Sequence, residues 1–343
     1  LKPFWLQFHF GFKQIQTACS GMADKSRREL RANLMASAAT GGTIMLFTNP
    51  LDTLRCRWQV SGTSGQTLFS FSSAVARTEG VWVGFWRPGL PPNIVAMAMA
   101  IGGRNGFYPL FRDGIGTIAG GTEKVGPRGM FAAGLFAGMT GYLLASPLLQ
   151  VKTQMQVEAG RISVEGVYLT GAHAGFPPTY ASTFNALSTL AADGFSSNGM
   201  LGSLQSLWRG AGVIVGRGAA VAASQLSAYD STKTFLKAQG CQDGPLLHFV
   251  ASQVGALVCT TFSMPFDVVL TVYTSAQTLG GERKALYGTS GPLRCALTML
   301  RQEGPPVFFR GWVPAFLRIS PTTTSSFFLY EQLRRLVGIG YLD

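Results

Sequence analysis

The sequence predicts an all-α membrane protein with six transmembrane helices in three tandem repeats, related by pseudo-threefold symmetry and joined by short amphipathic helices. Two observations predict this fold: a proline motif that recurs three times, and six long apolar segments that fall into three pairs. A low content of charged residues favours the same class.

Each repeat starts with a long apolar, Gly-rich segment that ends at a proline motif. The three motifs are Pro50-Leu51-Asp52-Thr53-Leu54-Arg55, Pro147-Leu148-Leu149-Gln150-Val151-Lys152 and Pro265-Phe266-Asp267-Val268-Val269-Leu270. One such proline indicates only a helix kink. Three in the same context indicate an internal repeat.

A second landmark follows in each repeat: Trp86-Arg87-Pro88-Gly89, Trp208-Arg209-Gly210 and Phe309-Arg310-Gly311. A tyrosine then stands 21 residues after the aromatic residue in the second and third repeats, and 22 after it in the first, where Pro88 is inserted. The three units therefore share a register. We place them at residues 31–115, 128–238 and 245–338, after an N-terminal extension of residues 1–30.

The six long apolar segments span residues 32–58, 91–113, 129–157, 211–237, 246–274 and 312–337. Each exceeds the ~20 residues that a bilayer requires. Short amphipathic helices are expected near 70–79, 181–192 and 290–302, with loops at the Gly/Ser/Thr-rich stretches 60–66, 159–176, 195–203 and 279–291. The alternative is a soluble protein with buried Gly-rich helices, which the three paired spans do not favour.

Composition fits helices that pack closely in a membrane. The chain is 47% hydrophobic and only 13% charged, with 43 glycines, and small residues let membrane helices approach each other. We expect Gly134 and Gly138 to make such a contact. The mean hydropathy of +0.23 is low for a bundle, which favours helices with one face on lipid and another on a wet cavity.

The net charge of +12 comes from basic residues at predicted helix ends and loops. Anionic lipid headgroups and an anionic solute therefore fit better than nucleic acid. Five scattered cysteines and three isolated histidines predict no metal, cofactor or disulfide framework. No nucleophile–base set or phosphate loop indicates an enzyme. The first 30 residues read equally as a targeting remnant, an interfacial helix or an upstream artefact.

Further triplicate motifs resemble those of the mitochondrial carrier family. The acid-Gly pairs are Glu79-Gly80, Asp193-Gly194 and Glu303-Gly304, and the last two repeats add Tyr229-Asp230-Ser231-Thr232-Lys233 and Tyr330-Glu331-Gln332-Leu333-Arg334. The resemblance covers roughly residues 30–338. It implies a monomeric, multi-pass protein of the mitochondrial inner membrane that exchanges small anions by alternating access.

The second and third proline motifs, with Ser224-Gln225-Leu226 and Phe327-Phe328, look most like the oxaloacetate/sulfate carrier branch. That branch implies oxaloacetate, sulfate, malonate or a related small dianion or dicarboxylate as the substrate. This chain has Met97 and Ile101 where polar residues are expected, so the particular substrate stays open.

The resemblance also implies a matrix gate formed by the proline motifs of neighbouring repeats. Asp52 would pair with Lys152, and Asp267 with Arg55. The third pair would be Leu149 with Leu270, where both charges are missing. Losing both partners of an ion pair strands no charge and can be energetically neutral. Two further residues, Gln59 and Gln156, stand where the family places a bracing glutamine.

A cytoplasmic gate is implied at the opposite end. The expected pairs are Asp230 with Arg334 and Glu331 with Arg112, while Lys233 would lack its acid because Pro109 occupies that position.

The predicted solute site centres on two arginines. Arg217 and Arg318 each stand twelve residues before the repeat's tyrosine, or about 18 Å along a helix, which places them near mid-bilayer. An arginine there costs at least about 2.5–3.5 kcal/mol unless it faces a cavity. With no acids expected nearby, the pair predicts an anion site, to which Arg104 adds a third charge. The alternative is that both arginines only fill the cavity through bonds to backbone carbonyls.

The aromatic-Arg-Gly turns precede long helices and predict bound cardiolipin, because helix N-termini and basic side chains hold phosphate. The residues concerned are Trp86, Arg87, Trp208, Arg209, Gly210, Phe309, Arg310 and Gly311. Pro88 makes the first of these sites the weakest expected. The functional alternative to a carrier is a transport-inactive protein of the same fold, serving as a structural subunit of a larger inner-membrane (respiratory) complex.

Overall fold

The computed structural model describes residues 35–61, 67–119, 127–241, 245–279, 281, 284–288 and 291–322. The main helices are residues 35–60, α2 Leu68–Glu79, α3 Leu90–Ala119, α4 Pro127–Val157, α5 Thr183–Leu207, α6 Ala211–Ala238, α7 Pro245–Leu279, α9 Pro292–Glu303 and residues 312–322. Short helical turns cover Trp82–Trp86, Lys284–Gly288 and Pro305–Phe309. The predicted all-α class is confirmed, and the expected extension 1–30 lies outside the described residues.

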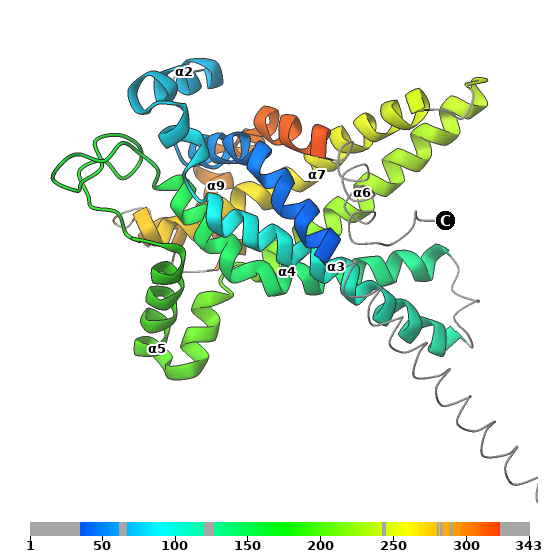
Figure 1. The fold of residues 1–343 in the computed structure, drawn as a ribbon, viewed down its shortest axis with the longest axis horizontal. Coiled ribbons are helices and arrows are strands. Elements are labelled where there is room, and N and C mark those ends of the chain that lie inside the picture. The colour runs from blue at the N-terminus through cyan, green and yellow to red at the C-terminus, as the bar shows by residue number, and fades with distance from the viewer. Residues whose placement is uncertain are drawn as a thin grey trace, which may run out of the picture.

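The long helices form a bundle, and the short helices gather at one end of it (Figure 1). Helix α3 packs along α4, and α6 packs along α7, while α4 also contacts α6 and α7. The order long helix, short helix, long helix recurs along the chain. All three proline motifs lie within long helices at the end where α2, α5 and α9 gather.

The glycine of each aromatic-Arg-Gly turn packs against the proline motif of another repeat. Gly89, Gly210 and Gly311 have φ values of 61°, 81° and 86°, which glycine adopts without steric cost. A Cβ on Gly89 would lie 2.8 Å from the Lys152 carbonyl oxygen, and one on Gly311 would lie 3.2 Å from Arg55 Cγ. A Cβ on Gly210 would lie 3.0 Å from Leu270 Cδ1.

Lys152, Leu270 and Arg55 occupy the same, last position of their motifs. Repeat one therefore packs on repeat two, two on three, and three on one. This cyclic relation is the pseudo-threefold arrangement that the repeats predict.

Close helix packing occurs at glycines, but not at the pair expected. A Cβ on Gly134 would have its nearest neighbour at 4.0 Å, and one on Gly138 at 3.9 Å, which are ordinary contacts. The tight position is Gly141, where a Cβ would lie 2.5 Å from the Ala100 carbonyl oxygen. The expectation for Gly134 and Gly138 was wrong because the G-x-x-x-G spacing gives a helix face, and only the crossing point on α3 decides which glycine is needed.

The second short helix also differs from its prediction. Residues 195–203 were expected to form a loop, but α5 continues through them to Leu207, with a kink at Asn198 and Gly199. The loop prediction was wrong because the Gly and Ser residues here do not end the helix; their small size lets two helical arms pack together. The other two short helices, α2 and α9, lie where they were expected.

Two described helices are long and apolar enough to cross a membrane on hydropathy: Phe131–Val157 at a mean of 1.4 and Phe249–Ala276 at 1.5. Helices 35–60, α3 and α6 also have the length, such as the 28 residues of α6, which exceeds the ~20 needed. They carry more polar groups, and α6 holds both Arg217 and Lys233. Residues 323–337 of the sixth predicted span lie outside the described set.

The segment between α4 and α5 ties repeat two to repeat one. The Thr170 hydroxyl donates to Glu79 Oε1 at 2.8 Å, at the end of α2. Arg57 pairs with the same carboxylate through two bonds of 2.6 and 2.7 Å. Because the side chains of Arg57 and Glu79 are buried, removing one partner would leave an uncompensated charge. The loop between α4 and α5 therefore stabilises the end of α2 and its contact with the first long helix.

We predict that Gly141→Ala lowers the thermal transition of the purified protein, while Gly134→Ala leaves it unchanged or raises it. The new methyl at 141 would collide with the α3 backbone, and such overpacking costs about 1–3 kcal/mol. At 134 the methyl has room, and alanine is favoured over glycine in a helix by about 0.5–1 kcal/mol. Thermal unfolding in mild detergent measures both, and equal shifts would contradict the assignment of the crossing point.

Candidate functional site

Six charged side chains meet where the proline-motif helices converge, and we call them the ion-pair cluster: Asp52, Arg55, Lys152, Arg217, Asp267 and Arg318. They line a cavity of about 60 Å³. Their side chains are at most 15% exposed. Charges this deeply buried are stable only when they are paired.

Both expected pairs of the predicted matrix gate are in contact. Lys152 Nζ donates to Asp52 Oδ2, and Arg55 Nη1 lies 3.1 Å from Asp267 Oδ2. Arg55 also reaches the acid of its own helix, because its Nη2 lies 3.1 Å from Asp52 Oδ1. Arg55 thus bridges the two carboxylates, a contact that pairwise reasoning between repeats did not predict.

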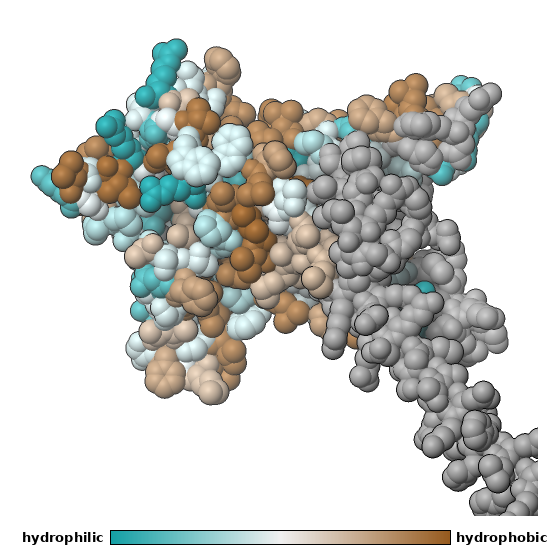
Figure 2. All heavy atoms as spheres, in the orientation of Figure 1, coloured by the Kyte–Doolittle hydropathy of each residue, from teal (hydrophilic) through white to brown (hydrophobic). Residues whose placement is uncertain are grey.

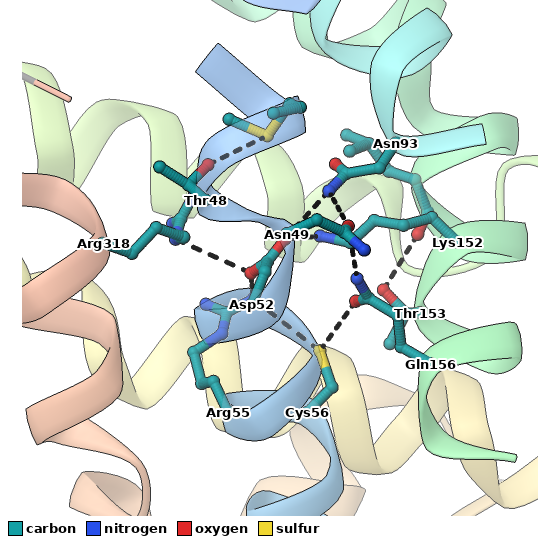
Figure 3. Close-up of polar contacts among 12 residues, drawn as sticks. Thr48, Asn49, Asp52, Arg55, Cys56, Asn93, Lys152, Thr153, Gln156 and Arg318 are labelled. Carbon is teal, nitrogen blue, oxygen red and sulfur yellow. Dashed lines mark hydrogen bonds and ion pairs between the residues drawn. The ribbon is translucent and has the colours of Figure 1, made fainter. Parts of the chain in front are cut away.

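The two arginines of the predicted solute site line the same cavity as the gate pairs. Figure 3 shows one of them, Arg318, beside Asp52. Arg217 Nε donates to Asp267 Oδ1 at 2.6 Å, and Arg318 Nε lies 3.6 Å from Asp52 Oδ1. The expectation that no acids lie nearby was therefore wrong. Counting residues along one helix gives a position on that helix, whereas the acids belong to other helices, whose placement only the fold decides.

The two arginines are not equally engaged. Arg217 makes a short hydrogen bond to its carboxylate. The buried Nε of Arg318 makes no hydrogen bond to the part of the chain that the structure describes, and its contact with Asp52 is longer than a hydrogen bond. Arg318 is therefore the cluster's most weakly held guanidinium.

Charge in the cluster does not balance. Four basic side chains face two carboxylates among the described residues that line the cavity, which leaves two positive charges in excess. Burying an uncompensated charge is costly, so such a site favours an anionic occupant. Guanidinium groups bind carboxylates and sulfate with paired, charge-assisted hydrogen bonds.

The third gate position, predicted to hold Leu149 and Leu270, is apolar in the structure too. Leu149 and Leu270 line the same cavity as the charged groups, together with Met97 and Ile214. No described charge is stranded opposite either leucine. At the proline-motif positions, the contact between repeats two and three is therefore apolar, while the other two are ion pairs. The Arg217–Asp267 pair links repeats two and three beside the leucines.

An amide network beside the cluster was missed by the sequence reasoning (Figure 3). Asn93 of α3 donates to Asn49 Oδ1 at 2.8 Å and lies 3.4 Å from Asp52 Oδ2. Asn49 in turn donates to the Trp86 carbonyl oxygen at 2.7 Å. These contacts hold Asp52 in place and connect it to the aromatic-Arg-Gly turn of its repeat.

A signal for this network was present in the sequence. Asn49 directly precedes Pro50, whereas Ser146 and Met264 precede the other two prolines. A buried amide in only one of three repeats indicates a local hydrogen-bond demand, since buried polar groups are almost always bonded.

The two predicted bracing glutamines behave differently. Gln156 Nε2 donates to Asn49 Oδ1 at 3.1 Å and its Oε1 accepts from Cys56 at 3.3 Å, so it joins the amide network. The buried amide of Gln59 makes no hydrogen bond to the described residues, and it lies beside Gly311. Among the described residues, neither glutamine side chain bonds to Asp52, Asp267 or their basic partners.

Arg104 lies apart from the cluster. It stands on α3 with its Cδ 3.9 Å from the position of a Cβ on Gly138, is exposed, and is not among the residues that line the cavity. Its expected part in the solute site is not visible in this arrangement.

The predicted cytoplasmic gate is described only in part. Arg112 is exposed and lies 3.3 Å from its neighbour Asp113, and Lys233 is half-buried on α6. The side chain of Asp230 and the residues Glu331 and Arg334 lie outside the described set. The pairs at this end stay predictions.

The aromatic-Arg-Gly turns differ in what their arginines contact. Arg87 is exposed, whereas Arg209 lies 4.3 Å over the ring of Tyr273 and donates to the Gly288 carbonyl oxygen. Arg310 pairs with Glu303. A cavity of about 560 Å³ opens at the third turn, where Phe309, Arg310 and Gly311 meet Trp58 and Leu68.

Comparison with known proteins agrees with the threefold organisation. A family model described as "Mitochondrial carrier protein" matches three consecutive segments, residues 26–118, 123–240 and 242–340. The dicarboxylate carrier UCP2 of Danio rerio is 30% identical over 307 residues, 84% of this chain and 87% of the relative.

Two further relatives match at similar levels. The mitochondrial 2-oxoglutarate/malate carrier protein of Mus musculus is 29% identical over 306 residues, 87% of this chain and 88% of the relative. The mitochondrial brown fat uncoupling protein 1 of Canis lupus familiaris is 29% identical over 316 residues, 89% of this chain and 92% of the relative. With the family model repeated three times along nearly its whole length, this chain belongs to the mitochondrial carrier family.

Proposed function

We propose that this carrier exchanges small dianions across the mitochondrial inner membrane by alternating access. Dicarboxylates such as oxaloacetate and malonate, and sulfate, are the substrate class. The observation that carries the proposal is the excess of two positive charges in the ion-pair cluster. A dianion neutralises that excess, whereas a cation or a neutral solute does not.

The names of two relatives support the same class, since one is a dicarboxylate carrier and another a 2-oxoglutarate/malate carrier. The ion-pair cluster also suggests how binding is coupled to opening of the matrix gate. A dianion that bonds to Arg217 and Arg318 competes with Asp267 and Asp52 for them. Those carboxylates lie in the pairs that close the matrix end, so substrate binding weakens closure.

The function is tested by uptake of labelled sulfate, malonate and oxaloacetate into liposomes that contain the purified full chain. We expect exchange above that of empty vesicles, and faster uptake when the vesicles are preloaded with a dianion. A folded protein that moves none of these anions would overturn the proposal and favour the structural-subunit alternative. Copurification of a stoichiometric partner complex would then identify that role.

Arg318→Gln and Arg217→Gln should separate binding from stability. A charge-assisted hydrogen bond is worth about 1.5–3 kcal/mol, so each substitution should raise the half-saturation concentration roughly tenfold or more. Arg217→Gln should also lower the thermal transition, because it breaks a short buried pair. Arg318→Gln should leave the transition nearly unchanged, because Asp52 keeps Lys152 and Arg55.

The exposed Arg77→Gln on α2 is the matched control and should change neither quantity. If both cluster variants lose stability and keep their half-saturation concentrations, the arginines are cavity fillers and the site assignment fails.

Leu149→Asp tests the charge excess directly. The new carboxylate enters the cavity wall and reduces the excess from two charges to one. We expect a steep rise in the half-saturation concentration for dianions and a relative gain for monoanions, because like charges a few ångström apart in a low dielectric repel by several kcal/mol. Leu149→Asn matches the size without the charge and should change the preference far less. Equal effects of Asp and Asn would show that polarity, and not charge, matters.

The proposal includes bound cardiolipin at the aromatic-Arg-Gly turns, with the third turn the strongest site. It is supported by the cavity beside Phe309 and Gly311 and by the free backbone N–H groups at the start of helix 312–322. Arg209 is turned toward Tyr273, which favours the second turn less. Native mass spectrometry of Arg310→Gln should show the largest loss of retained cardiolipin among single Arg→Gln variants at positions 87, 209 and 310.

A further inference from the structure

Repeat two carries an insertion that the other repeats lack. Trp86 follows Gly80 by six residues and Phe309 follows Gly304 by five, but Trp208 follows Gly194 by fourteen. The extra residues lie between the acid-Gly pair and the aromatic-Arg-Gly turn. They form the distal part of α5.

The inserted residues change how the short helix ends. Gly80 and Gly304 have positive φ values and end α2 and α9. Gly194 stays helical, and the chain reverses instead at Asn198 and Gly199, where φ of Gly199 is 60°. Helix α5 therefore becomes a hairpin with arms of residues 183–197 and 200–207, which we call the α5 hairpin.

Small residues hold the two arms together. A Cβ on Gly202 would lie 2.0 Å from the Gly194 carbonyl oxygen, and one on Gly194 would lie 2.4 Å from that of Gly202. The Ser203 hydroxyl donates to the Ala191 carbonyl oxygen at 2.7 Å. The inner faces of the two arms are thus buried against each other.

Apolar side chains occupy the outer face of the second arm. Met200, Leu201, Leu204 and Trp208 are 77%, 66%, 49% and 37% exposed. Their spacing of i, i+1, i+4 and i+8 places them on one side of a helix. Figure 1 shows α5 projecting away from the bundle, and Figure 2 shows tan and brown residues at the lower end of that lobe.

This stripe continues onto the apolar outer surface of the bundle. The indole Nε1 of Trp208 donates to the Leu143 carbonyl oxygen of α4 at 2.8 Å. Leu143 and Leu144 are exposed on α4, within a segment apolar enough to cross a membrane. Tryptophan favours the boundary between headgroups and hydrocarbon, so Trp208 joins the two apolar surfaces at that depth.

We propose that the second arm of the α5 hairpin inserts Met200, Leu201 and Leu204 into the membrane interface beside the bundle. The inference rests on the membrane location given under the proposed function. Asp193 is the one charged residue of Thr183–Leu207, and it lies on the first arm. The contact is therefore driven by apolar burial and not by attraction to anionic headgroups.

An environment-sensitive fluorophore on Leu201→Cys tests the insertion in liposomes that contain the full chain. Cys19 and Cys241 are replaced by serine. Cys56, Cys259 and Cys295 are buried, and burial raises the pKa of the Cys295 thiol to about 12, which keeps it unreactive at neutral pH. We expect blue-shifted emission, strong quenching by spin-labelled lipid and weak quenching by aqueous iodide.

Two matched positions complete the design. Ser196→Cys, exposed on the first arm one turn from Asp193, should show the opposite quenching pattern. Leu144→Cys on α4 should be quenched by spin-labelled lipid whatever the hairpin does. Met200→Cys replaces Leu201→Cys if the latter lowers the thermal transition.

Iodide quenching of Leu201 equal to that of Ser196 overturns the insertion, as long as Leu144 is quenched by lipid. If Leu144 also escapes lipid quenching, the membrane location itself fails. Protection of Leu201 from both quenchers that disappears at one chain per vesicle would assign the stripe to contact between copies, and that result also overturns the proposal.

Discussion

The buried carboxylate of Asp52 is the interaction on which this end of the carrier depends. Three cations from three helices surround it: Lys152, Arg55 and Arg318. A carboxylate this deep is stable only because of them, and they in turn would repel one another without it. The helices of all three repeats that supply these groups are therefore held together by one shared charge.

Holding that charge in place requires backbone features that lie several residues away. The aromatic-Arg-Gly glycines let each turn pack on the next repeat's proline motif, beside Lys152, Leu270 and Arg55. The Asn49–Asn93 pair adds hydrogen bonds in repeat one alone. In every repeat a glycine lets the turn approach the neighbouring proline motif. In repeat one, the amides also orient the Asp52 carboxylate toward its three cations.

The three repeats differ at one gate position, where both members of the ion pair are replaced by leucine. Two of the three gate positions in the proline motifs carry ion pairs, and the third carries Leu149 and Leu270. Because both charges are absent, no group is stranded there, and separating two leucines breaks no ion pair. The two ionic gate pairs balance each other, so the excess of two positive charges comes from Arg217 and Arg318.

The family resemblance implied the pairs Asp52–Lys152 and Asp267–Arg55, which are in contact. The sequence by itself determined the repeats and the helical class, because both follow from spacing along one chain and from the register of three copies. It did not determine that Arg55 bridges both acids, that the solute arginines share those acids, or that Gly141 and not Gly138 forms the crossing. Nor did it give the α5 hairpin, because the glycines and serines of residues 195–203 predict a loop, whereas in the structure they let two helical arms pack together. These features were decided by tertiary structure, because they depend on the angle and height at which separate helices cross.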